Sequence, residues 1–99
     1  MTKRERIKDI YEDLKSGFRM CEMIPTRNVD GWIVGFHQGL SFSCDGEYIR
    51  FLGAGSWAIK ASLKNLTEQL QFYNCDIRMI VTESEFEKRS GKKFFGWRI

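Results

Sequence analysis

The feature that most constrains the fold is a turn signal in the middle of the chain, Asp45 followed by Gly46. Both residue types tolerate the positive φ angles that the tightest hairpin turns require. A turn centred on them pairs Cys44 with Glu47 and predicts an antiparallel hairpin. One face of this hairpin then carries Leu40, Phe42, Ile49 and Phe51, and the other carries Ser41, Ser43, Tyr48 and Arg50. The turn and the hydrophobic alternation therefore predict the same register.

The N-terminal residues predict a helix. Thr2 and Glu5 have the spacing of a capping box, in which two side chains satisfy the backbone N–H groups at a helix start. An apolar stripe follows at helical spacing, made of Ile7, Ile10, Tyr11 and Leu14. Gly17 is the residue type that commonly ends a helix in a left-handed conformation.

The remaining elements follow from shorter signals. We expect strands at 18–24, where Pro25 stops the first, at 31–36 and at 76–81, and a last strand or extended segment at 94–99. A second helix should follow the glycine loop 53–56, and its buried stripe should be Ile59, Leu63, Leu66, Leu70 and Tyr73. A capping box at Thr82 and Glu85 predicts a short third helix ending at Gly91. The fold class is thus α+β, with a mostly antiparallel sheet of about five or six strands packed with two main helices and the short third one.

Composition limits the classes of function. A chain of 99 residues, with a hydrophobic fraction of 42%, has the size of a single domain covering 1–99. No apolar run approaches the ~20 residues that span a bilayer. The cysteines Cys21, Cys44 and Cys75 lie far apart without a Cys-x-x-Cys pair. We therefore expect free thiols in a reducing cytoplasm, with no disulfide and no bound metal.

Signals for catalysis or for a cofactor are weak. His37 is the single histidine, expected at the tip of a connection, and no nucleophile with a base beside it can be identified. The loop 53–56, expected between a strand and a helix, has N–H groups that suit an anion, with Ser56 and Lys60 nearest to it. It lacks the Lys-Ser/Thr ending of a phosphate-binding loop. We expect no catalytic residues and no cofactor.

From the first helix to Leu70, the expected elements are a helix, several strands and a second helix. This element order resembles that of the double-stranded RNA-binding domain. That family carries basic residues at the start of its second helix, and here Lys60 and Lys64 take this place. Trp57 and Ile59 stand where the family is polar, and the residues after Leu70 have no counterpart in it. The resemblance is an analogy of element order, and it implies contact with RNA.

The densest charge cluster lies at the C-terminal end, where no acidic residue occurs from 88 to 99. Its cations are Lys88, Arg89, Lys92, Lys93 and Arg98, and its aromatic residues are Phe94, Phe95 and Trp97. Cations mixed with aromatic rings are typical of nucleic-acid sites and of hot spots in protein interfaces. Period-two alternation would instead direct Phe95, Trp97 and Ile99 into the core. The next candidate surface is formed by Tyr48, Arg50 and Trp57.

These observations favour binding over catalysis. The first hypothesis is a small non-enzymatic protein-binding module whose partner has an acidic surface. It would be an inhibitor or adaptor of the kind that phages and mobile elements encode, acting on a host protein such as a defence nuclease. The alternative is a domain that binds RNA or DNA through the basic C-terminal region. The net charge of +3 is lower than most dedicated nucleic-acid binders carry.

Overall fold

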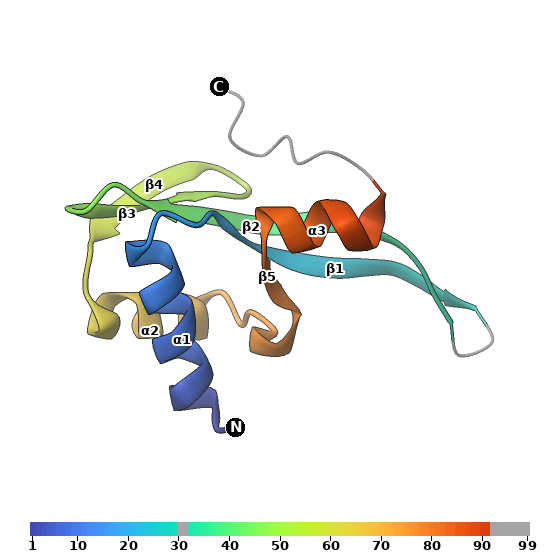
Figure 1. The fold of residues 1–99 in the computed structure, drawn as a ribbon, viewed down its shortest axis with the longest axis horizontal. Helices are drawn as coiled ribbons and strands as arrows, with labels where there is room; N and C mark the ends of the chain where they lie inside the picture. The colour runs from blue at the N-terminus through green and yellow to red at the C-terminus, as the bar shows by residue number, and fades with distance from the viewer. Residues whose placement is uncertain (30–31, 92–99) are drawn as a thin grey trace.

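The chain folds into one five-stranded antiparallel sheet with helices on both faces (Figure 1). This computed structural model describes residues 1–29 and 32–91, with side chains at all of these except 26–29 and 32–35. The elements are α1 (Lys3–Lys15), β1 (Met20–Val29), β2 (Trp32–Cys44), β3 (Tyr48–Leu52), β4 (Ser56–Lys60), α2 (Leu63–Phe72), the 3₁₀ turn η1 (Ile77–Met79), β5 (Ile80–Thr82) and α3 (Glu83–Ser90). The strand order is β4-β3-β2-β1-β5, which confirms the predicted α+β class. The strand or extended segment expected at 94–99 lies outside the described residues.

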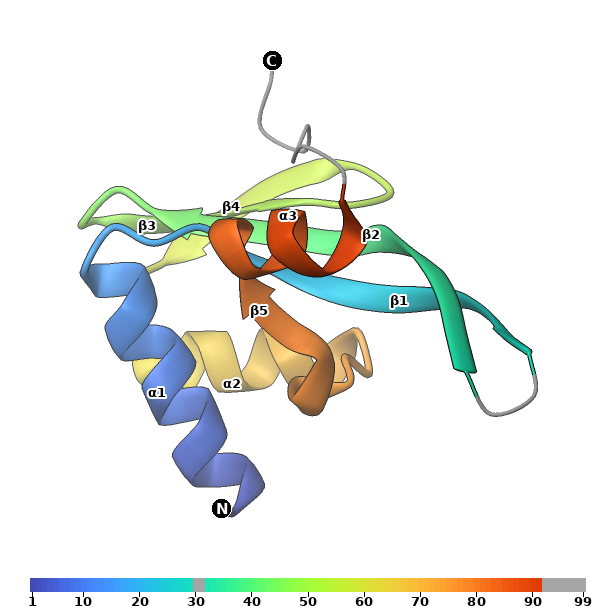
Figure 2. The ribbon, with the colours of Figure 1, turned by 45° about the vertical axis from the view of Figure 1, so that its right-hand side comes forward.

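The two faces of the sheet have separate cores. Helices α1 and α2 lie on one face and α3 lies on the other (Figures 1 and 2). The larger core lies under α1 and α2 and contains Ile7, Ile10, Leu14, Met20, Leu40, Phe42, Ile49, Phe51, Leu66, Leu70, Cys75, Ile77 and Ile80. The smaller core lies under α3 and contains Cys21, Met23, Val81 and Phe86. None of the helices in the described part of the chain combines the length and hydropathy needed to cross a bilayer.

Helices α1 and α3 begin and end where their capping signals predict. The Thr2 hydroxyl accepts a hydrogen bond from the Glu5 N–H at 3.2 Å, and Gly17 follows α1 with φ +93°. The Thr82 hydroxyl accepts from the Glu85 N–H at 3.2 Å, and Gly91 ends α3 with φ +69°. Both predicted capping boxes therefore supply the hydroxyl cap expected of them.

The β2–β3 hairpin forms, but its register differs from the predicted one. Cys44 pairs with Ile49, and Phe42 pairs with Phe51. Each paired residue of β2 therefore has a partner on β3 that lies two positions later in the sequence than predicted. The Asp45 N–H donates to the Tyr48 carbonyl at 3.1 Å, which centres the turn on Gly46 and Glu47. A shift of two residues leaves every side chain on its predicted face, because the strand period is two.

Strands β1 and β2 run longer than predicted and form one continuous pair. Pro25 does not stop β1, since it pairs with Phe36, and His37 lies inside β2 opposite Ile24 instead of at a tip. Beyond Glu22, no described strand pairs with the other side of β1, and an edge strand tolerates a proline. Gly39 and Leu40 both lie opposite Glu22, which is a bulge that lets β2 continue through the expected gap.

The prediction for α2 was wrong at its start. Residues 56–60 form strand β4, and α2 begins only at Leu63, where the Ser62 hydroxyl accepts from the Asn65 N–H at 3.1 Å. Ile59 therefore belongs to a strand. Of the expected stripe, Leu66 and Leu70 are buried, whereas Leu63 and Tyr73 are exposed.

The segment 76–81 also differs from the predicted strand. Its first part is the turn η1, because the Asp76 carboxylate accepts the Arg78 N–H at 3.0 Å and caps it. Only the short β5 remains, and it pairs with β1 at the far edge of the sheet. The Arg6 guanidinium donates to the Ile80 carbonyl at 2.5 Å and ties α1 to β5.

Candidate functional site

An aromatic stack runs from the core of the sheet to the surface. The ring centroids of Phe42 and Phe51 lie 5.6 Å apart, those of Phe51 and Trp57 5.3 Å, and those of Trp57 and Tyr73 4.9 Å. Phe72 packs its ring on Tyr73 edge to face at 4.8 Å. Phe42 is fully buried, whereas Phe72 is 77% exposed and Tyr73 is 45% exposed. The buried end of the stack thus supports an outer surface made of Trp57, Phe72 and Tyr73, which we call the aromatic surface.

Two elements hold the aromatic surface in place. Trp57 lies on β4 directly opposite Phe51 of β3, so its ring faces the α2 side of the sheet. Its indole N–H donates to the Gln69 side-chain oxygen at 3.0 Å, which joins β4 to α2. Tyr73 caps the end of α2. Because each ring contacts the next, the exposed rings are fixed before any partner arrives, which lowers the entropy cost of binding.

A hollow of about 400 Å³ lies beside the aromatic surface. Trp57 and Tyr73 form part of its wall, and the loop between β3 and β4 forms another part. Glu22 is the one charged side chain in the wall, and its carboxylate accepts the Asp76 N–H at 3.0 Å. The hollow therefore offers an apolar space next to exposed rings, of the kind that holds an anchoring side chain in an interface.

Strand β4 is one edge of the sheet, and no other described strand pairs with its outer side. The Ala61 N–H donates to the Glu47 carbonyl and the Gly53 N–H to the Gly55 carbonyl, each at 2.9 Å. Bonds in an antiparallel ladder alternate, so Trp57 and Ile59 bond to β3, whereas Ser56, Ala58 and Lys60 point their N–H and C=O groups outward. The Asn65 side-chain N–H donates to the Lys60 carbonyl at 2.9 Å, so this one outward group already has a partner. The other outward groups of this strand form what we call the β4 edge.

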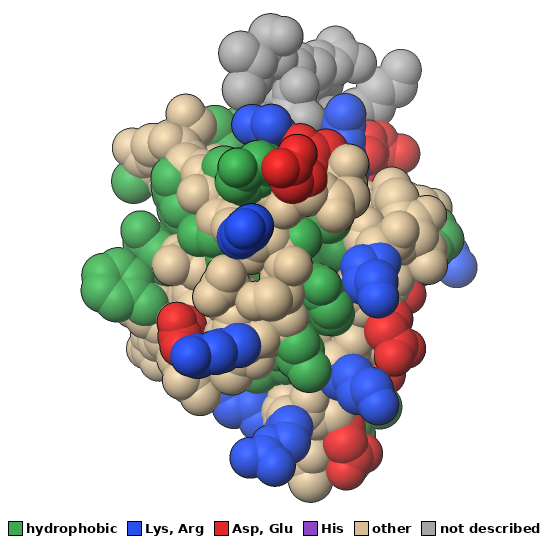
Figure 3. All heavy atoms as spheres, turned by 90° about the vertical axis from the view of Figure 1, so that its left-hand side faces the viewer, with side chains coloured by type: hydrophobic (Ala, Val, Ile, Leu, Met, Phe, Trp, Pro, Cys, Tyr) green, Lys and Arg blue, Asp and Glu red, His purple; other side chains and the backbone are tan. Residues whose placement is uncertain are grey.

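Positive charge borders the β4 edge. From residue 48 to residue 67 the sequence contains Arg50, Lys60 and Lys64 and no acidic residue. Lys60 and Lys64 are exposed and form no ion pair with any described residue. The face at the left of Figure 1, which carries the β2–β3 turn and the start of α2, shows basic side chains with acidic and hydrophobic ones between them (Figure 3).

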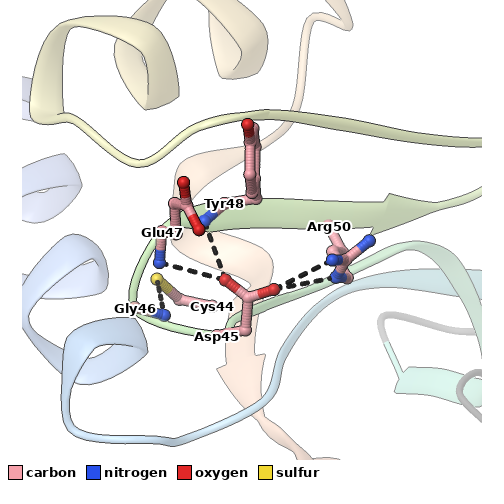
Figure 4. A network of polar contacts seen from close by, with 6 residues as sticks. All are labelled: Cys44, Asp45, Gly46, Glu47, Tyr48 and Arg50. Carbon is pink, nitrogen blue, oxygen red and sulfur yellow. Dashed lines mark hydrogen bonds and ion pairs between the residues drawn. The ribbon is translucent and has the colours of Figure 1, made fainter.

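The turn beside this surface has its own acidic partner for Arg50 (Figure 4). The Asp45 carboxylate accepts the Tyr48 N–H at 2.8 Å, the Glu47 N–H at 3.0 Å and the Arg50 guanidinium at 2.9 Å. The N–H groups of Tyr48 and Glu47, followed by Arg50, hold the pKa of Asp45 below its usual value. Arg50 is therefore less available to an outside partner than Lys60.

The structure places part of the predicted C-terminal cluster. Lys88 and Arg89 are exposed on α3, and the Arg89 guanidinium donates to the Glu85 carboxylate at 2.6 Å. Lys92, Lys93 and Arg98 lie outside the described residues. The prediction that these five cations form one binding surface stays a prediction.

The second predicted surface is divided by the sheet. Tyr48 and Arg50 lie on the face that also carries α3, opposite Lys60 and Ala58 on the neighbouring strand. Trp57 lies on the other face and stacks on Tyr73. The structure thus brings Trp57 together with Phe72 and Tyr73 instead of with Tyr48 and Arg50. No pattern in the sequence marks Phe72 as a surface residue, and the predicted stripe that includes Tyr73 starts too early along the chain.

Two weaker signals change their meaning in the structure. The loop 53–56 joins two strands, so it does not open a helix, and the Gly53 N–H is already bonded to Gly55. Ser56 and Lys60 belong to β4, so the loop does not stand at the helix start that the anion-site alternative requires. Four strands separate α1 from α2, and only Lys64 of the two lysines lies on α2, which weakens the analogy with RNA-binding domains. Within the described residues, no three His, Cys, Asp or Glu side chains gather as metal ligands would.

No protein-family model, curated protein or solved structure matches this chain, so its function has to be inferred from its own residues.

Proposed function

We propose that this chain is a small protein-binding module that engages its partner through the aromatic surface. The observation that carries the proposal is the aromatic stack, which ends in a 77% exposed Phe72 that rests on Tyr73. Phe72 and Tyr73 are exposed and in contact, and a contiguous apolar patch of this kind marks an interaction site. Tryptophan and tyrosine, the other two residues of this surface, are enriched among the hot spots of protein interfaces.

Charge supports a partner with an acidic surface. Lys60, on the α3 side of β4, and Lys64, at the start of α2, are exposed and form no ion pair with any described residue. Such cations speed the encounter with an acidic protein more than they deepen the affinity. The three free thiols support a reducing compartment such as the cytoplasm. The narrower role of a phage or mobile-element inhibitor directed at a host protein, such as a defence nuclease, stays a prediction from size and aromatic content.

The test is a capture experiment with a matched pair of variants. The purified chain is immobilised and exposed to nuclease-treated lysate from the organism that encodes it, and captured proteins are identified by mass spectrometry. Phe72→Ser should abolish capture of the specific partner. Phe18→Ser should not, because Phe18 is also exposed, at 53%, but lines a different hollow beside α3.

Three outcomes would contradict the proposal. If both variants lose the partner to the same extent, the interface does not depend on Phe72 in particular. If neither variant loses it, the interface lies elsewhere on the protein. A parallel capture from untreated lysate is compared with the capture from nuclease-treated lysate, and capture that appears only without nuclease would favour the nucleic-acid alternative. In that case binding to a labelled oligonucleotide should weaken steeply as salt rises, because phosphate contacts release counterions.

A further inference from the structure

The β4 edge has the geometry of a site for an added strand. Its outward N–H groups lie at Ser56, Ala58 and Lys60, and its outward carbonyls lie at Ser56 and Ala58, because the Lys60 carbonyl already accepts from Asn65. This alternate spacing is the one at which an antiparallel or parallel neighbour places its own donors and acceptors. An extended peptide that joins such an edge gains main-chain hydrogen bonds for affinity, and it gains specificity from alternate side chains. The opposite edge is less suitable, since β5 is only three residues long and β1 beyond it contains Pro25.

The two sides of β4 differ in chemistry. Trp57 and Ile59 point to the α2 side, where Tyr73 and the apolar hollow lie. Ser56, Ala58 and Lys60 point to the α3 side, where Arg50 lies opposite Ala58. A guest strand therefore meets apolar and aromatic groups with every second side chain and positive charge with the others.

We propose that the partner segment is an extended acidic peptide that adds to the sheet along β4, with apolar residues alternating with Asp or Glu. The apolar residues pack beside Trp57 and Ile59, and one enters the hollow next to Tyr73. The acidic residues lie on the α3 side, next to Lys60, which forms no ion pair with any described residue. This inference rests on the proposed function, because it names the kind of segment that reaches the aromatic surface.

The test uses a defined probe, a fluorescein-labelled octapeptide of alternating valine and glutamate, measured by fluorescence anisotropy at low salt. Ala58→Pro removes one outward N–H and leaves the β3–β4 ladder intact, because the Ala58 N–H does not bond to β3. This variant should bind the peptide at least tenfold more weakly. Ala58→Val keeps the N–H and should bind within about twofold of wild type. Lys60→Glu should also weaken binding, and the weakening should diminish at high salt.

Probe variants test the same contacts without changing the protein. N-methylation of alternate peptide amides removes donors from one side of the guest strand only. One of the two methylated sets should abolish binding and the other should not. A peptide of alternating valine and lysine should bind at least tenfold more weakly than the glutamate peptide.

Several results would overturn the inference. Equal binding of the peptide by Ala58→Pro and Ala58→Val would exclude the β4 edge as its site. Equal binding of the two methylated peptides would do the same. If the lysine peptide binds as tightly as the glutamate peptide, the proposed acidic character of the partner is wrong. A dimer that light scattering detects in wild type and that Ala58→Pro dissociates would mean that a second copy occupies the edge. If Phe72→Ser loses the captured partner and Ala58→Pro keeps it, the proposed function stands and only the added strand fails.

Discussion

At the scale of single residues, two leucines on α2 differ sharply in what they contribute. Leu66 is fully buried in the larger core, whereas Leu63, expected on the same stripe, is 36% exposed at the start of the helix. Leu66→Ala should lower the free energy of unfolding by about 2–4 kcal/mol, through lost burial and a cavity. Leu63→Ala is the matched control and should cost less than about 1 kcal/mol. Urea denaturation of both variants measures the difference, and equal losses would mean that α2 is rotated.

Gly39 is a second residue whose identity the packing determines. It lies in the bulge of β2, where an added Cβ would overlap the Cδ1 atom of Ile24. Gly39→Ala should destabilise the protein by up to about 1 kcal/mol, because the Ile24 side chain has to change its rotamer to make room. Adding Ile24→Ala should recover part of that loss, so the two changes should be non-additive in a double-mutant cycle. Strict additivity would show that the Ile24 side chain turns aside without an energetic cost.

At the scale of elements, the β2–β3 turn makes stability depend on pH. The folded pKa of Asp45 lies below the usual value, so the ionised carboxylate stabilises the fold above about pH 4, the ordinary value of an aspartate. This contribution is lost as the pH falls through the folded pKa. Asp45→Asn should therefore be less stable than wild type at neutral pH, and the difference should shrink in acid. Thermal melts at a series of pH values test this, and a constant difference would contradict it.

Elements whose ends are marked by local side chains could be predicted from the sequence. Helices α1 and α3 carry their caps at Thr2 and Thr82, and both begin where those residues predict. The start of α2 could not be predicted in this way, because apolar residues at 57, 59, 63 and 66 suit a strand and a helix over the same stretch. Pairing with β3 decides for the strand at 56–60, and only the Ser62 cap marks the later helix start.

At the scale of the whole molecule, burial protects two of the three thiols. Burial, followed by the Glu83 carboxylate, raises the pKa of Cys21 to about 12. Burial, followed by Glu22, raises the pKa of Cys75 to about 12. Both are therefore protonated and unreactive at pH 8, whereas Cys44 is only half-buried. Ellman's reagent should label one thiol rapidly in native protein and all three in denaturant. Rapid labelling of all three in native protein would contradict the described core.

The candidate site also belongs to this scale, and for that reason the sequence could predict little of it. Trp57 and Tyr73 are sixteen positions apart in the sequence, and they stack only because β4 and α2 fold onto the same sheet face. Helical spacing predicts burial for Tyr73, and the sequence pattern predicts a surface that joins Trp57 to Tyr48 and Arg50, so neither prediction brings the two rings together. The exposure of the Phe72 side chain depends on where α2 ends, and no local sequence signal predicts the position of that end.

The hydrogen-bonded position of Trp57 has a spectroscopic consequence. Its indole is held between Phe51 and Tyr73 and donates to Gln69, in the one place where sheet edge, helix end and hollow meet. The chain has three tryptophans, and replacing Trp32 and Trp97 by phenylalanine leaves Trp57 as the single emitter. A molecule that covers this position should shield the indole from iodide quenching and shift its emission to the blue. The protein thus contains a natural optical reporter at the very surface through which we propose that it works.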